Sequence, residues 1–495
     1  MKIKRIVSLL LIISIACLPI LASCNGKTGG NSGTTAVGDT QDTAPVSATD
    51  PKEQFDPKLA PVDMGGYVFQ VATRDDNAPY HNYPAHTRDL YAEAENGDLI
   101  NDAVYRRNSA IEDKYNCKIE MDAYPENIDE STLNNNVDKA VKAGDKSYDL
   151  AMTHMMYGVT TATKGDFYDI ATFPNIDITK PYWNKGANDG CSIGHRLFTG
   201  LSDYSFSTNE NVYCIFFNKQ LIQNYGIENP YQLVDNNQWT FDKFDQIIRV
   251  GYSDLNGNGV SDKDDQFGYA SSNSVEFLWA GGSHMAAKDA NDIPYMDFLS
   301  QRTTDIYAKA FDITNNDFTF SEDQWYKDDG IKIFQDGRAV FHGSQLCRVN
   351  NLRGVTFDYG IVPYPKFDST QENYYSYVDG HASMMGIPLC LPHPEWTGML
   401  IEDMSYLAYK DILPVYYDVV LDVKMVRDEE SVAMLKILFD SKVFDPAYIM
   451  GLSLWIDWIN NIMKKNTDIV SMYDKESATL QKNMQKTIDA ILAIQ

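Results

Sequence analysis

The sequence of 495 residues is poor in basic side chains and, beyond its N-terminus, has no long apolar run. Only 42 Lys and Arg residues stand against 69 Asp and Glu residues, which gives a formal net charge of −27. A surface of this sign repels phosphate backbones, so nucleic acid is not expected as a partner. No stretch after the first residues reaches the roughly 20 apolar residues that a membrane span needs.

Cysteine is also scarce, and its spacing excludes two common roles. Seven are present, of which Cys17 and Cys24 lie near the N-terminus, and the others are Cys117, Cys191, Cys214, Cys347 and Cys390. No CxxC pair suggests zinc, and no dense framework suggests a disulfide scaffold. We therefore predict that these five are buried free thiols, because Cys often packs as a small apolar side chain.

The usual signatures of catalysis are missing as well. The sequence contains no HExxH, GxSxG, Walker or GxGxxG motif in a suitable context, and its eight histidines are dispersed. A glycosidase needs only two carboxylates, and with 69 acidic residues composition cannot identify such a pair. A secreted glycan-active hydrolase and a structural or adhesive surface protein therefore stay open beside a protein that only binds its ligand.

The N-terminus has the pattern of an export signal. Lys2, Lys4 and Arg5 precede an apolar run over residues 6–21. The run is marginally long enough for a transmembrane anchor, but Leu21-Ala22-Ser23-Cys24 resembles a bacterial lipobox and favours cleavage after residue 23 and lipidation of Cys24. We expect an extracytoplasmic protein, lipid-anchored to the outer face of the cytoplasmic membrane.

Residues 24–62 are rich in Gly, Ser, Thr, Asp and Pro. Such a segment buries too little apolar surface to offset its ordering entropy, so we predict a flexible linker. The roughly 430 residues that follow exceed what one core usually supports, which predicts two lobes.

The first part of this region alternates strand and helix patterns. Residues 67–72 and 117–124 alternate as strands do, and residues 101–115 have helical spacing between them. A further helix is closed by Gly144 and is followed by a strand over residues 148–153. This rhythm is typical of a mainly parallel sheet with crossover helices.

The later chain repeats the pattern. A strong strand at 212–217 runs into a helix that Gly226 ends. Thr240 has the position of a helix N-cap, and Trp239 and Phe244 that of a hydrophobic staple. The segments DYGIVPYP and ASMMGIPL predict short strands, and a long helix is expected from about Lys475.

One loop, DLNGNGVSDKDD at residues 254–265, has the spacing of a twelve-residue calcium loop. The predicted ligands are Asp254, Asn256, Asn258, the Val260 carbonyl, Asp262 and Asp265. Gly259 occupies the position of the sharp turn, and Asp replaces the usual Glu at the last position. A solvated Asn/Gly turn is the alternative. We predict a structural calcium ion with no open position for substrate.

Several longer segments resemble one known family. They are NDAVYRRNSAIEDKYNCKI, AGDKSYDLAMTH, NVYCIFFNKQLIQNYGIENPYQLV, WTFDKF with the calcium loop, FQDGRAVFHGSQLCRVNNLR, FDYGIVPYPKFD, ENYYSYVDGHASMMGIP and VRDEESVAMLKILFDSKVFD. Together with the lipobox, their order and spacing resemble family 1 extracellular solute-binding lipoproteins of ABC importers. The resemblance extends over about residues 65–460.

The resemblance implies an α/β fold of the type II periplasmic-binding-protein-like kind. Each lobe has a mainly parallel sheet flanked by helices, and crossing strands hinge the two around a ligand cleft. From the positions of these motifs, we expect lobe one to consist of residues 63–203 and 341–388, and lobe two of residues 210–338 and 389–495. Crossings are expected near 202–210, 338–341 and 387–391.

It also implies that the chain captures a carbohydrate, an oligosaccharide above all, and delivers it to ABC permease subunits as a monomer without enzymatic activity. Sugar binding needs aromatic faces and planar polar groups, and the chain has 31 Tyr and 7 Trp. Ligands gather beyond the carboxyl ends of parallel strands. The candidate ligand-binding residues are Asp75, Asp76, His154, Tyr157, Asp203, Tyr204, Asn209, Glu210, Glu276, Trp279, Arg348, Asp379, His381 and Trp455, with Arg74 and His342 as further options.

Overall fold

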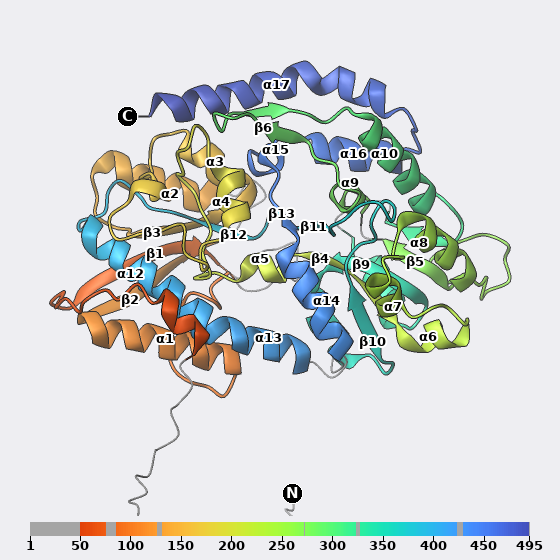
Figure 1. Cartoon of the computed structure of the whole chain (residues 1–495), viewed down its shortest axis with the longest axis horizontal. Coiled ribbons are helices and arrows are strands. Elements are labelled where there is room, and N and C mark those ends of the chain that lie inside the picture. Colours follow the sequence, from red (N-terminus) through yellow and green to blue (C-terminus); the bar gives the residue numbers. More distant parts are fainter. Residues whose placement is uncertain are drawn as a thin grey trace, which may run out of the picture. The chain divides into compact units, whose positions relative to one another are not determined.

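A four-stranded sheet forms the centre of the first lobe (Figure 1). The computed structural model describes residues 50–75, 86–125, 131–271, 273–322, 327–422 and 429–494. The predicted signal peptide, Cys24 and residues 25–49 of the linker lie outside these ranges, as does Asp76.

The strand order of this first sheet is β12-β3-β1-β2. Strand β1 (Tyr67–Arg74) pairs in parallel with β2 (Cys117–Tyr124) and β3 (Leu150–His154), and β12 (Ser383–Gly386) runs antiparallel to β3. Strand β3 is buried along its whole length, which fits the apolar residues Leu150, Ala151 and Met152 at its start. The edge strand β2 alternates instead, because one of its faces meets solvent.

The helices of the first lobe include a long continuous segment late in the chain. They are α1 (Leu99–Tyr115), α2 (Ser131–Ala143), α3 (Met155–Ala162), α4 (Lys185–Cys191), α12 (Pro394–Leu407), a π-helical turn (Ala408–Ile412) and α13 (Leu413–Asp422). Both α12 and α13 pack on α1. The end of α1 is tied to α12 through Asp403, whose carboxylate accepts a bond of 2.6 Å from the Tyr115 hydroxyl.

The second lobe is built on a five-stranded mixed sheet of order β10-β4-β9-β5-β8. Its strands are β4 (Tyr213–Asn218), β5 (Phe267–Ser271), β8 (Thr319–Ser321), β9 (Ala339–Gln345) and β10 (Tyr359–Val362). Strand β5 is parallel to β8 and β9, whereas β4 is antiparallel to β9 and β10. Strands β8 and β10 form the two edges.

Short helices surround this sheet. They are α6 (Lys219–Asn224), α7 (Pro230–Asp235), α8 (Phe241–Ile248), α9 (Glu276–Ala280), α10 (Gln301–Thr314), α11 (Asp329–Gln335), α14 (Glu429–Asp440) and α16 (Leu454–Met463). The predicted N-cap of α8 is confirmed, because Thr240 Oγ1 accepts from the Lys243 amide at 3.3 Å. The predicted staple is confirmed too, with the Trp239 and Phe244 rings 5.4 Å apart.

Three short elements lie between the two sheets in Figure 1: α5 (Ser207–Glu210), β11 (Ser376–Tyr377) and β13 (Lys442–Val443). Strands β11 and β13 pair in parallel. After β13 the chain forms α15 (Pro446–Ile449), which contacts α3 and α4. These elements make up the hinge between the lobes.

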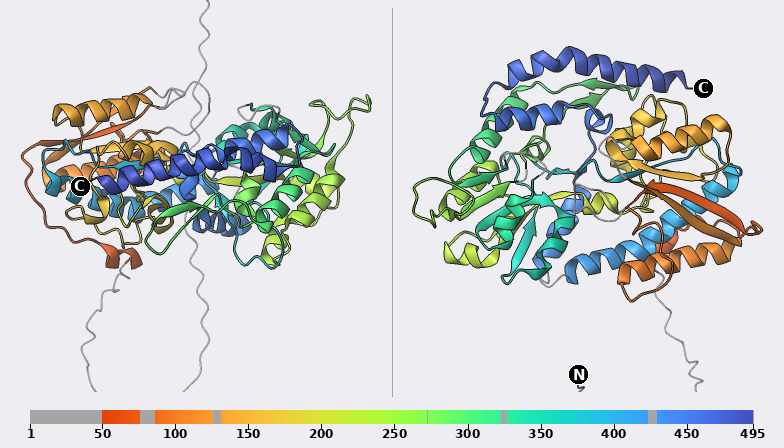
Figure 2. Two further views of the ribbon diagram at one scale, coloured as in Figure 1. Left: turned by 90° about the horizontal axis from the view of Figure 1, so that it is seen from above. Right: turned by 180° about the vertical axis from the view of Figure 1, so that it is seen from behind.

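The final helix, α17 (Ile469–Ala493), extends along both lobes (Figure 2). It packs on α10 and α16 of the second lobe and on α3 of the first, and also on the hairpin of β6 (Ala286–Lys288) and β7 (Pro294–Met296). At its end, Arg196 of the first lobe donates to the carbonyls of Ile491 and Ile494, at 3.2 and 2.5 Å. This helix begins several residues before the predicted start at Lys475.

The predicted lobe boundaries differ from this arrangement in the second half of the chain. Strands β9 and β10 belong to the second sheet, so the chain does not return at 338–341 but between β10 and β12. Helices α12 and α13 pack on α1 of the first lobe, so the crossing predicted at 387–391 is wrong, and α14 packs on β10 and α7 of the second lobe. The error arose because strand patterns do not show which sheet a strand joins.

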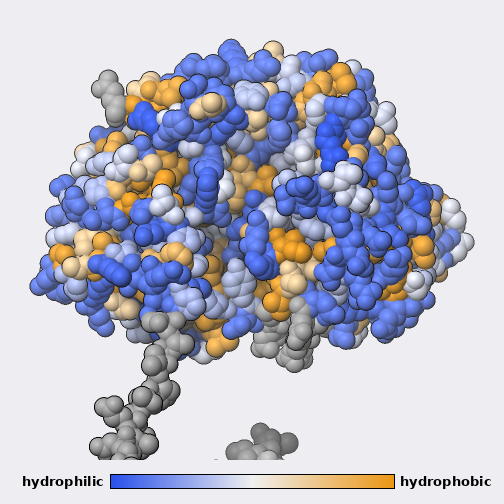
Figure 3. All heavy atoms as spheres, viewed as in Figure 1, coloured by the Kyte–Doolittle hydropathy of each residue, from blue (hydrophilic) through white to orange (hydrophobic). Residues whose placement is uncertain are grey.

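The folded part also begins earlier than predicted. A 3₁₀ helix, Pro51–Phe55, replaces the end of the expected linker, and Lys52 Nζ donates to the Tyr409 carbonyl at 2.7 Å. Cys117, Cys191, Cys214, Cys347 and Cys390 are buried free thiols, as predicted. Among the described residues, no helix is both long and apolar enough to cross a membrane. Hydrophilic residues cover most of the face seen in Figure 3.

Candidate functional site

A cavity of about 60 Å³ lies between the two lobes. The first lobe and its link to the hinge contribute Met156, Asp379 and His381, while β4 and β9 of the second lobe contribute Tyr213 and His342. The other lining residues are Asn273, Glu322, Lys327, Asp328, Ile331, Ser344, Gln345, Arg348, Tyr377, Tyr448, Trp455 and Ile459.

A carboxylate and an imidazole form the polar centre of this cavity. His381 Nδ1 lies 2.6 Å from Asp379 Oδ1, and Gln345 Nε2 donates to Asp379 Oδ2 at 3.1 Å. Burial alone would raise the pKa of Asp379, but His381 and the hydrogen bonds outweigh it and hold that pKa below its ordinary value. Asp379 is therefore an ionised hydrogen-bond acceptor at neutral pH.

His342 offers a second acceptor. Its Nδ1 lies 2.9 Å from the Ala270 carbonyl, so this nitrogen carries the proton and Nε2 is left as an acceptor. Nε2 is buried and has no hydrogen-bond partner among the described residues. Burial, with a smaller effect from Arg348, lowers the pKa of His342 to about 4, so the ring is neutral. An uncompensated buried acceptor at a cavity wall is suited to a ligand hydroxyl.

Aromatic rings form one wall of the cavity. The Tyr213 and Tyr377 rings lie 4.9 Å apart, and the Tyr377 and Tyr448 hydroxyl oxygens are 2.5 Å apart. Trp455 meets the Tyr448 ring edge-on at 5.9 Å. Such rings provide apolar surface with polar ends, which suits a ligand with both apolar faces and hydroxyl groups.

Four predicted site residues, Arg348, Asp379, His381 and Trp455, do line this cavity. Arg348 is nearly buried, and its Nη2 is 3.2 Å from Asp328 Oδ1. The pair therefore brings a guanidinium and a carboxylate to the cavity lining from the second lobe.

Two further predicted residues lie directly behind His381. The His154 ring is 5.0 Å from the His381 ring and 4.9 Å from the Tyr157 ring. His154 is the last residue of β3, and its Nδ1 accepts from the Met156 amide at 3.2 Å as the N-cap of α3. These two side chains support His381 rather than line the cavity.

Four predicted residues stabilise the hinge instead. Lys442 of β13 donates to Asn209 Oδ1 at 2.6 Å, and Glu210 pairs with Arg88 at 3.0 Å. Burial raises the pKa of Asp203, and the positive charge of Lys442 partly offsets this rise. Burial lowers the pKa of Lys442, and the negative charge of Asp203 partly offsets that fall. The fourth, Tyr204, is fully buried beneath the Arg107 guanidinium.

Glu276 and Trp279 of α9 lie behind the aromatic wall. Trp279 stacks on Tyr377 with ring centroids 4.6 Å apart, and its Nε1 donates to Asp445 at 3.2 Å. Both carboxylate oxygens of Glu276 are buried without a partner among the described residues, and burial raises its pKa to about 8. Glu276 is therefore protonated at neutral pH.

Asp75 and Asp76 follow β1. The Asp75 amide donates to the Tyr124 carbonyl at 2.7 Å, and Asp75 is not among the residues that line the cavity. Asp76 lies outside the described residues. Of the further options, Arg74 is buried and donates to the His381 carbonyl at 2.7 Å, so it positions that residue.

Sequence reasoning did not single out Tyr213, Ser344, Gln345, Tyr377 or Tyr448. One signal was present, because His342 and Ser344 are polar residues at alternate positions of β9, a strand buried along its whole length. The tyrosines gave no such signal, since a buried Tyr in a strand usually serves packing alone.

The predicted calcium loop has the expected turn geometry. Asp254 accepts from the amides of Gly257 at 2.7 Å and Gly259 at 2.9 Å. Both glycines have positive φ, 71° and 74°, which other residues rarely adopt. The first carboxylate of the loop therefore organises its turn.

Side-chain amides surround the acidic residue at the ninth position of the loop. Asn256 and Asn258 donate to Asp262 at 3.3 and 2.7 Å, and the Val260 amide donates to Asn258 Oδ1 at 2.7 Å. Asp265 is buried and accepts from the Leu255 amide at 3.1 Å. The described residues contain no preassembled group of three ionisable metal ligands, so calcium stays a prediction.

The fold is that of known two-lobed binding proteins. No family model and no curated protein matches the sequence. Among solved structures, UspC of M. tuberculosis matches with a TM-score of 0.56 and 14% identity, covering 84% of this chain and 100% of that one. A cyclic α-maltosyl-1,6-maltose binding protein from Arthrobacter globiformis gives 0.53 and 12%, covering 87% and 99%. A cyclo/maltodextrin-binding protein in complex with maltotetraose gives 0.54 and 12%, covering 86% and 96%. These similarities show the two-lobed periplasmic-binding-protein-like fold.

Proposed function

We propose that the protein is the solute-binding component of an ABC importer and that it captures a carbohydrate between its two lobes. The observation that carries this proposal is the interlobe cavity, where rings from Tyr213, Tyr377 and Trp455 meet the hydrogen-bonding groups of Asp379 and His342. A sugar offers apolar ring faces to the former and hydroxyl groups to the latter. Two of the similar structures are named for their maltodextrin-type ligands, which supports the same class of ligand.

The size of the cavity requires the lobes to separate before a sugar enters. About 60 Å³ is far below the roughly 300–1,000 Å³ of small-molecule sites. A sugar unit therefore needs the lobes further apart than they are in this structure, and the hinge of α5, β11 and β13 is where the lobes would rotate. Ligand binding then shifts the balance toward closure, because the closed form adds contacts from the second lobe.

Calorimetry with a sugar panel on a matched pair of variants tests the proposal. Trp455→Ala removes an aromatic ring from the cavity and should weaken sugar binding by about 30-fold or more, the effect of losing an interface tryptophan worth about 2 kcal/mol. Trp396→Ala is the control, because Trp396 is half-buried like Trp455 but packs on Tyr67 and His393 of the first lobe. The absence of heat and of any melting shift with every sugar tested would refute carbohydrate as the ligand class.

We propose that the protein binds its ligand without converting it. Two of the similar structures are named as binding proteins. The pKa of Asp379 is held below its ordinary value, which does not suit the proton donor of a glycosidase. Incubation of purified protein with each ligand, followed by chromatography, tests this point. A shortened or newly reducing product would instead support the hydrolase.

We propose that the mature chain begins at Cys24, is tethered by lipid to the outer face of the cytoplasmic membrane, and works as a monomer with two permease subunits. The lipobox and the linker composition support this anchor. Replacing Cys24 with alanine should release the protein from the membrane fraction. Retention of this variant in the membrane would favour a transmembrane signal anchor.

We further propose that the loop at residues 254–265 holds a structural calcium ion. The bonds that Asp254 accepts from Gly257 and Gly259 keep its carboxylate at the start of the turn, and Asp262 lies within the same loop. Oxygen ligands of this kind suit a hard cation. The ion would stabilise the connection between α8 and β5 without contacting the sugar.

A further inference from the structure

Helix α17 joins the two lobes a second time, apart from the hinge of α5, β11 and β13 (Figure 1). Its 25 residues form a rod of about 38 Å, at about 1.5 Å per residue. The helix packs on α10 and α16 of the second lobe and on α3 of the first. The β6–β7 hairpin, which comes between α9 and α10 of the second lobe in sequence, contacts α17 and lies beside it (Figure 2). How firmly each end of this helix is held therefore decides how the lobes can separate.

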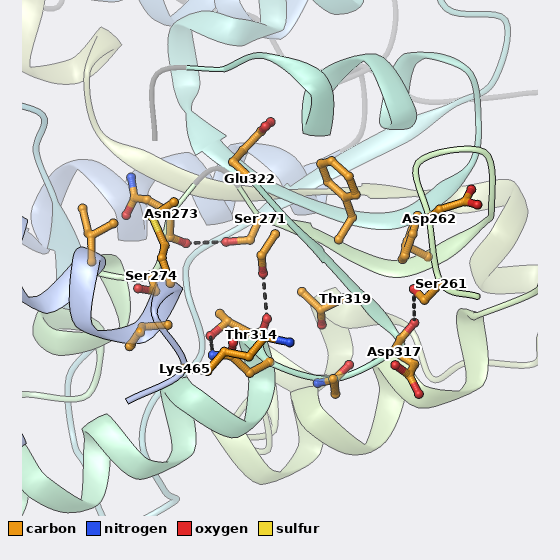
Figure 4. A pocket seen from close by; sticks show the side chains of 18 residues that line it. Ser261, Asp262, Ser271, Asn273, Ser274, Thr314, Asp317, Thr319, Glu322 and Lys465 are labelled. Carbon is orange, nitrogen blue, oxygen red and sulfur yellow. Dashed lines mark hydrogen bonds between the residues drawn. The ribbon is translucent and has the colours of Figure 1, made fainter. Parts of the chain in front are cut away.

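The start of α17 is fixed to the second lobe. Lys465, just before this helix, lines a pocket of about 460 Å³ within that lobe (Figure 4). Tyr307 of α10 donates to the Asn466 carbonyl at 2.6 Å, and Tyr473 of α17 packs against Phe298 with ring centroids 5.2 Å apart. The three aromatic side chains are buried, so this end of the helix moves with the second lobe.

Arg196 of the first lobe holds the other end of α17. Its Nη1 donates to the carbonyls of Ile491 and Ile494, at 3.2 and 2.5 Å. The last carbonyls of a helix have no partner within it and carry partial negative charge, so a guanidinium stabilises them. The first lobe therefore supplies the cap for a helix that starts in the second lobe.

Lys288 of the β6–β7 hairpin makes the converse contact. Its Nζ donates to the Asp189 carbonyl and, at 2.5 Å, to the Ser192 carbonyl. These carbonyls lie at the C-terminal end of α4 in the first lobe, where a cation is stabilising for the same reason. Each lobe thus contributes a basic side chain that caps a helix held by the other lobe.

The turn of the hairpin adds two bonds to the first lobe. Asp292 accepts from the His195 amide through Oδ2 at 2.9 Å, and from the Gly194 amide through its own carbonyl at 3.0 Å. Asp292 Oδ1 also accepts from Lys288 at 2.9 Å. Burial alone would raise the pKa of Asp292, but the bonds from Lys288 and His195 outweigh it and hold that pKa below its ordinary value. The carboxylate is therefore ionised at neutral pH.

The two ends of this connection differ in strength. The start of α17 is held by buried aromatic packing, whereas its end and the hairpin turn are held by hydrogen bonds whose groups water can also satisfy. Each such bond contributes only about 1 kcal/mol net, or up to about 3 kcal/mol where one group is charged. When the lobes separate, a helix of fixed length should therefore come away from the first lobe and stay with the second.

We propose that the hairpin turn and the end of α17, residues 288–293 and 491–494, form a latch that holds the lobes as they lie in this structure and detaches from residues 189–196 of the first lobe when the lobes separate. A sugar unit needs more room than the interlobe cavity of about 60 Å³ offers, so release of the latch precedes its entry. As a control of ligand entry the latch rests on the proposed function. Its release is a property of the ligand-free protein and is measured without a sugar.

Two variants weaken the latch from opposite sides. Arg196→Ala removes the guanidinium that holds the end of α17. Lys288→Met removes the cation of the hairpin but keeps a side chain of similar length. Arg196→Lys keeps a donor near the helix carbonyls and should restore part of the effect of Arg196→Ala.

Arg249→Ala is the matched control. Arg249 donates to Asp245 at 2.8 Å and lies over the Phe318 ring at 5.4 Å. Like Arg196 it combines hydrogen bonds with an aromatic contact, but these contacts lie within the second lobe. Melting temperatures verify that each variant is folded, and Lys288→Met carries the test alone if Arg196→Ala does not fold.

Small-angle X-ray scattering gives the radius of gyration of each ligand-free protein, and hydrogen exchange with mass spectrometry follows the amides of Gly194 and His195. We expect both latch variants to have a larger radius of gyration than the unaltered protein and the control, by more than the error of the measurement. The two amides should exchange about tenfold faster in both variants, which corresponds to a latch weakened by about 1.4 kcal/mol.

An unchanged radius of gyration in both variants would overturn the latch, even with faster exchange, because the contacts would then be local helix caps. An equal effect in the control would also overturn it. Since neither measurement uses a sugar, these results judge the latch alone. Failure of every sugar to bind would refute the proposed function but not the release of the latch.

Discussion

The stability of this protein should depend on His342 in a way that pH reveals. The imidazole is 1% exposed, and burial lowers its pKa from the ordinary 6.5 to about 4. In the unfolded chain His342 gains a proton near pH 6.5, whereas in the folded protein it gains one only near pH 4. Between these values the unfolded state binds more protons, so acid favours unfolding.

The magnitude follows from the shift. Each pKa unit corresponds to about 1.4 kcal/mol, so a shift from 6.5 to about 4 removes roughly 3 kcal/mol of unfolding free energy between pH 7 and pH 4. Buried carboxyls with raised pKa values, such as Glu210 and Glu276, act in the opposite direction. A single pH titration therefore mixes both effects, and a variant is needed to separate them.

His342→Asn provides that separation, because its amide can donate to the Ala270 carbonyl as Nδ1 does but does not titrate. Urea unfolding at pH 7, 6, 5 and 4 gives the free energy for both proteins. The difference between them should move by roughly 3 kcal/mol in favour of the variant as the pH falls. A constant difference over this range would refute the reasoning that a buried neutral imidazole causes acid sensitivity.

Three further predictions concern packing and the metal. Trp279→Ala should lower the free energy of unfolding in urea by about 3–5 kcal/mol, because the ring is 1% exposed and stacks on Tyr377. A loss below about 1 kcal/mol would contradict this packing. Gly268→Ala should prevent recovery of folded protein, because the added Cβ would lie 1.7 Å from the Ile248 carbonyl oxygen. Gly354→Ala is the control: its added Cβ would have no atom within 4 Å, so its melting temperature should not change. EDTA, which would remove the proposed calcium ion, should lower the melting temperature and leave sugar affinity unchanged. Unchanged melting with lost binding would contradict a structural role.

Local sequence signals predicted local structure well. Thr240 caps α8, and the Trp239–Phe244 contact forms where the spacing placed it, because both depend on residues within one or two helical turns. Strands β1, β3 and β4 lie within a few residues of their predicted positions, since runs of buried side chains leave a clear pattern. The family resemblance predicted the type of two-lobed fold. Without it, the length of the chain predicted only that there are two lobes.

The site followed the sequence only in part. Arg348, Asp379, His381 and Trp455 line the cavity, but Glu210 pairs with Arg88 in the hinge, and Glu276 lies behind the aromatic wall. Nothing in the sequence distinguishes these outcomes, because an acidic residue after a strand can point toward the cleft or into the hinge.

The sequence by itself determined the strands, the helix caps, the export signal pattern and the excess of negative charge. Only the tertiary structure decided that β9 and β10 join the second sheet, that α12 and α13 pack on the first, and that the end of α17 meets Arg196 of the first lobe. The physical reason is range: caps and strand periodicity depend on neighbours along the chain, whereas sheet membership and cavity walls depend on contacts between residues far apart in the sequence, such as Phe267 and Ala339.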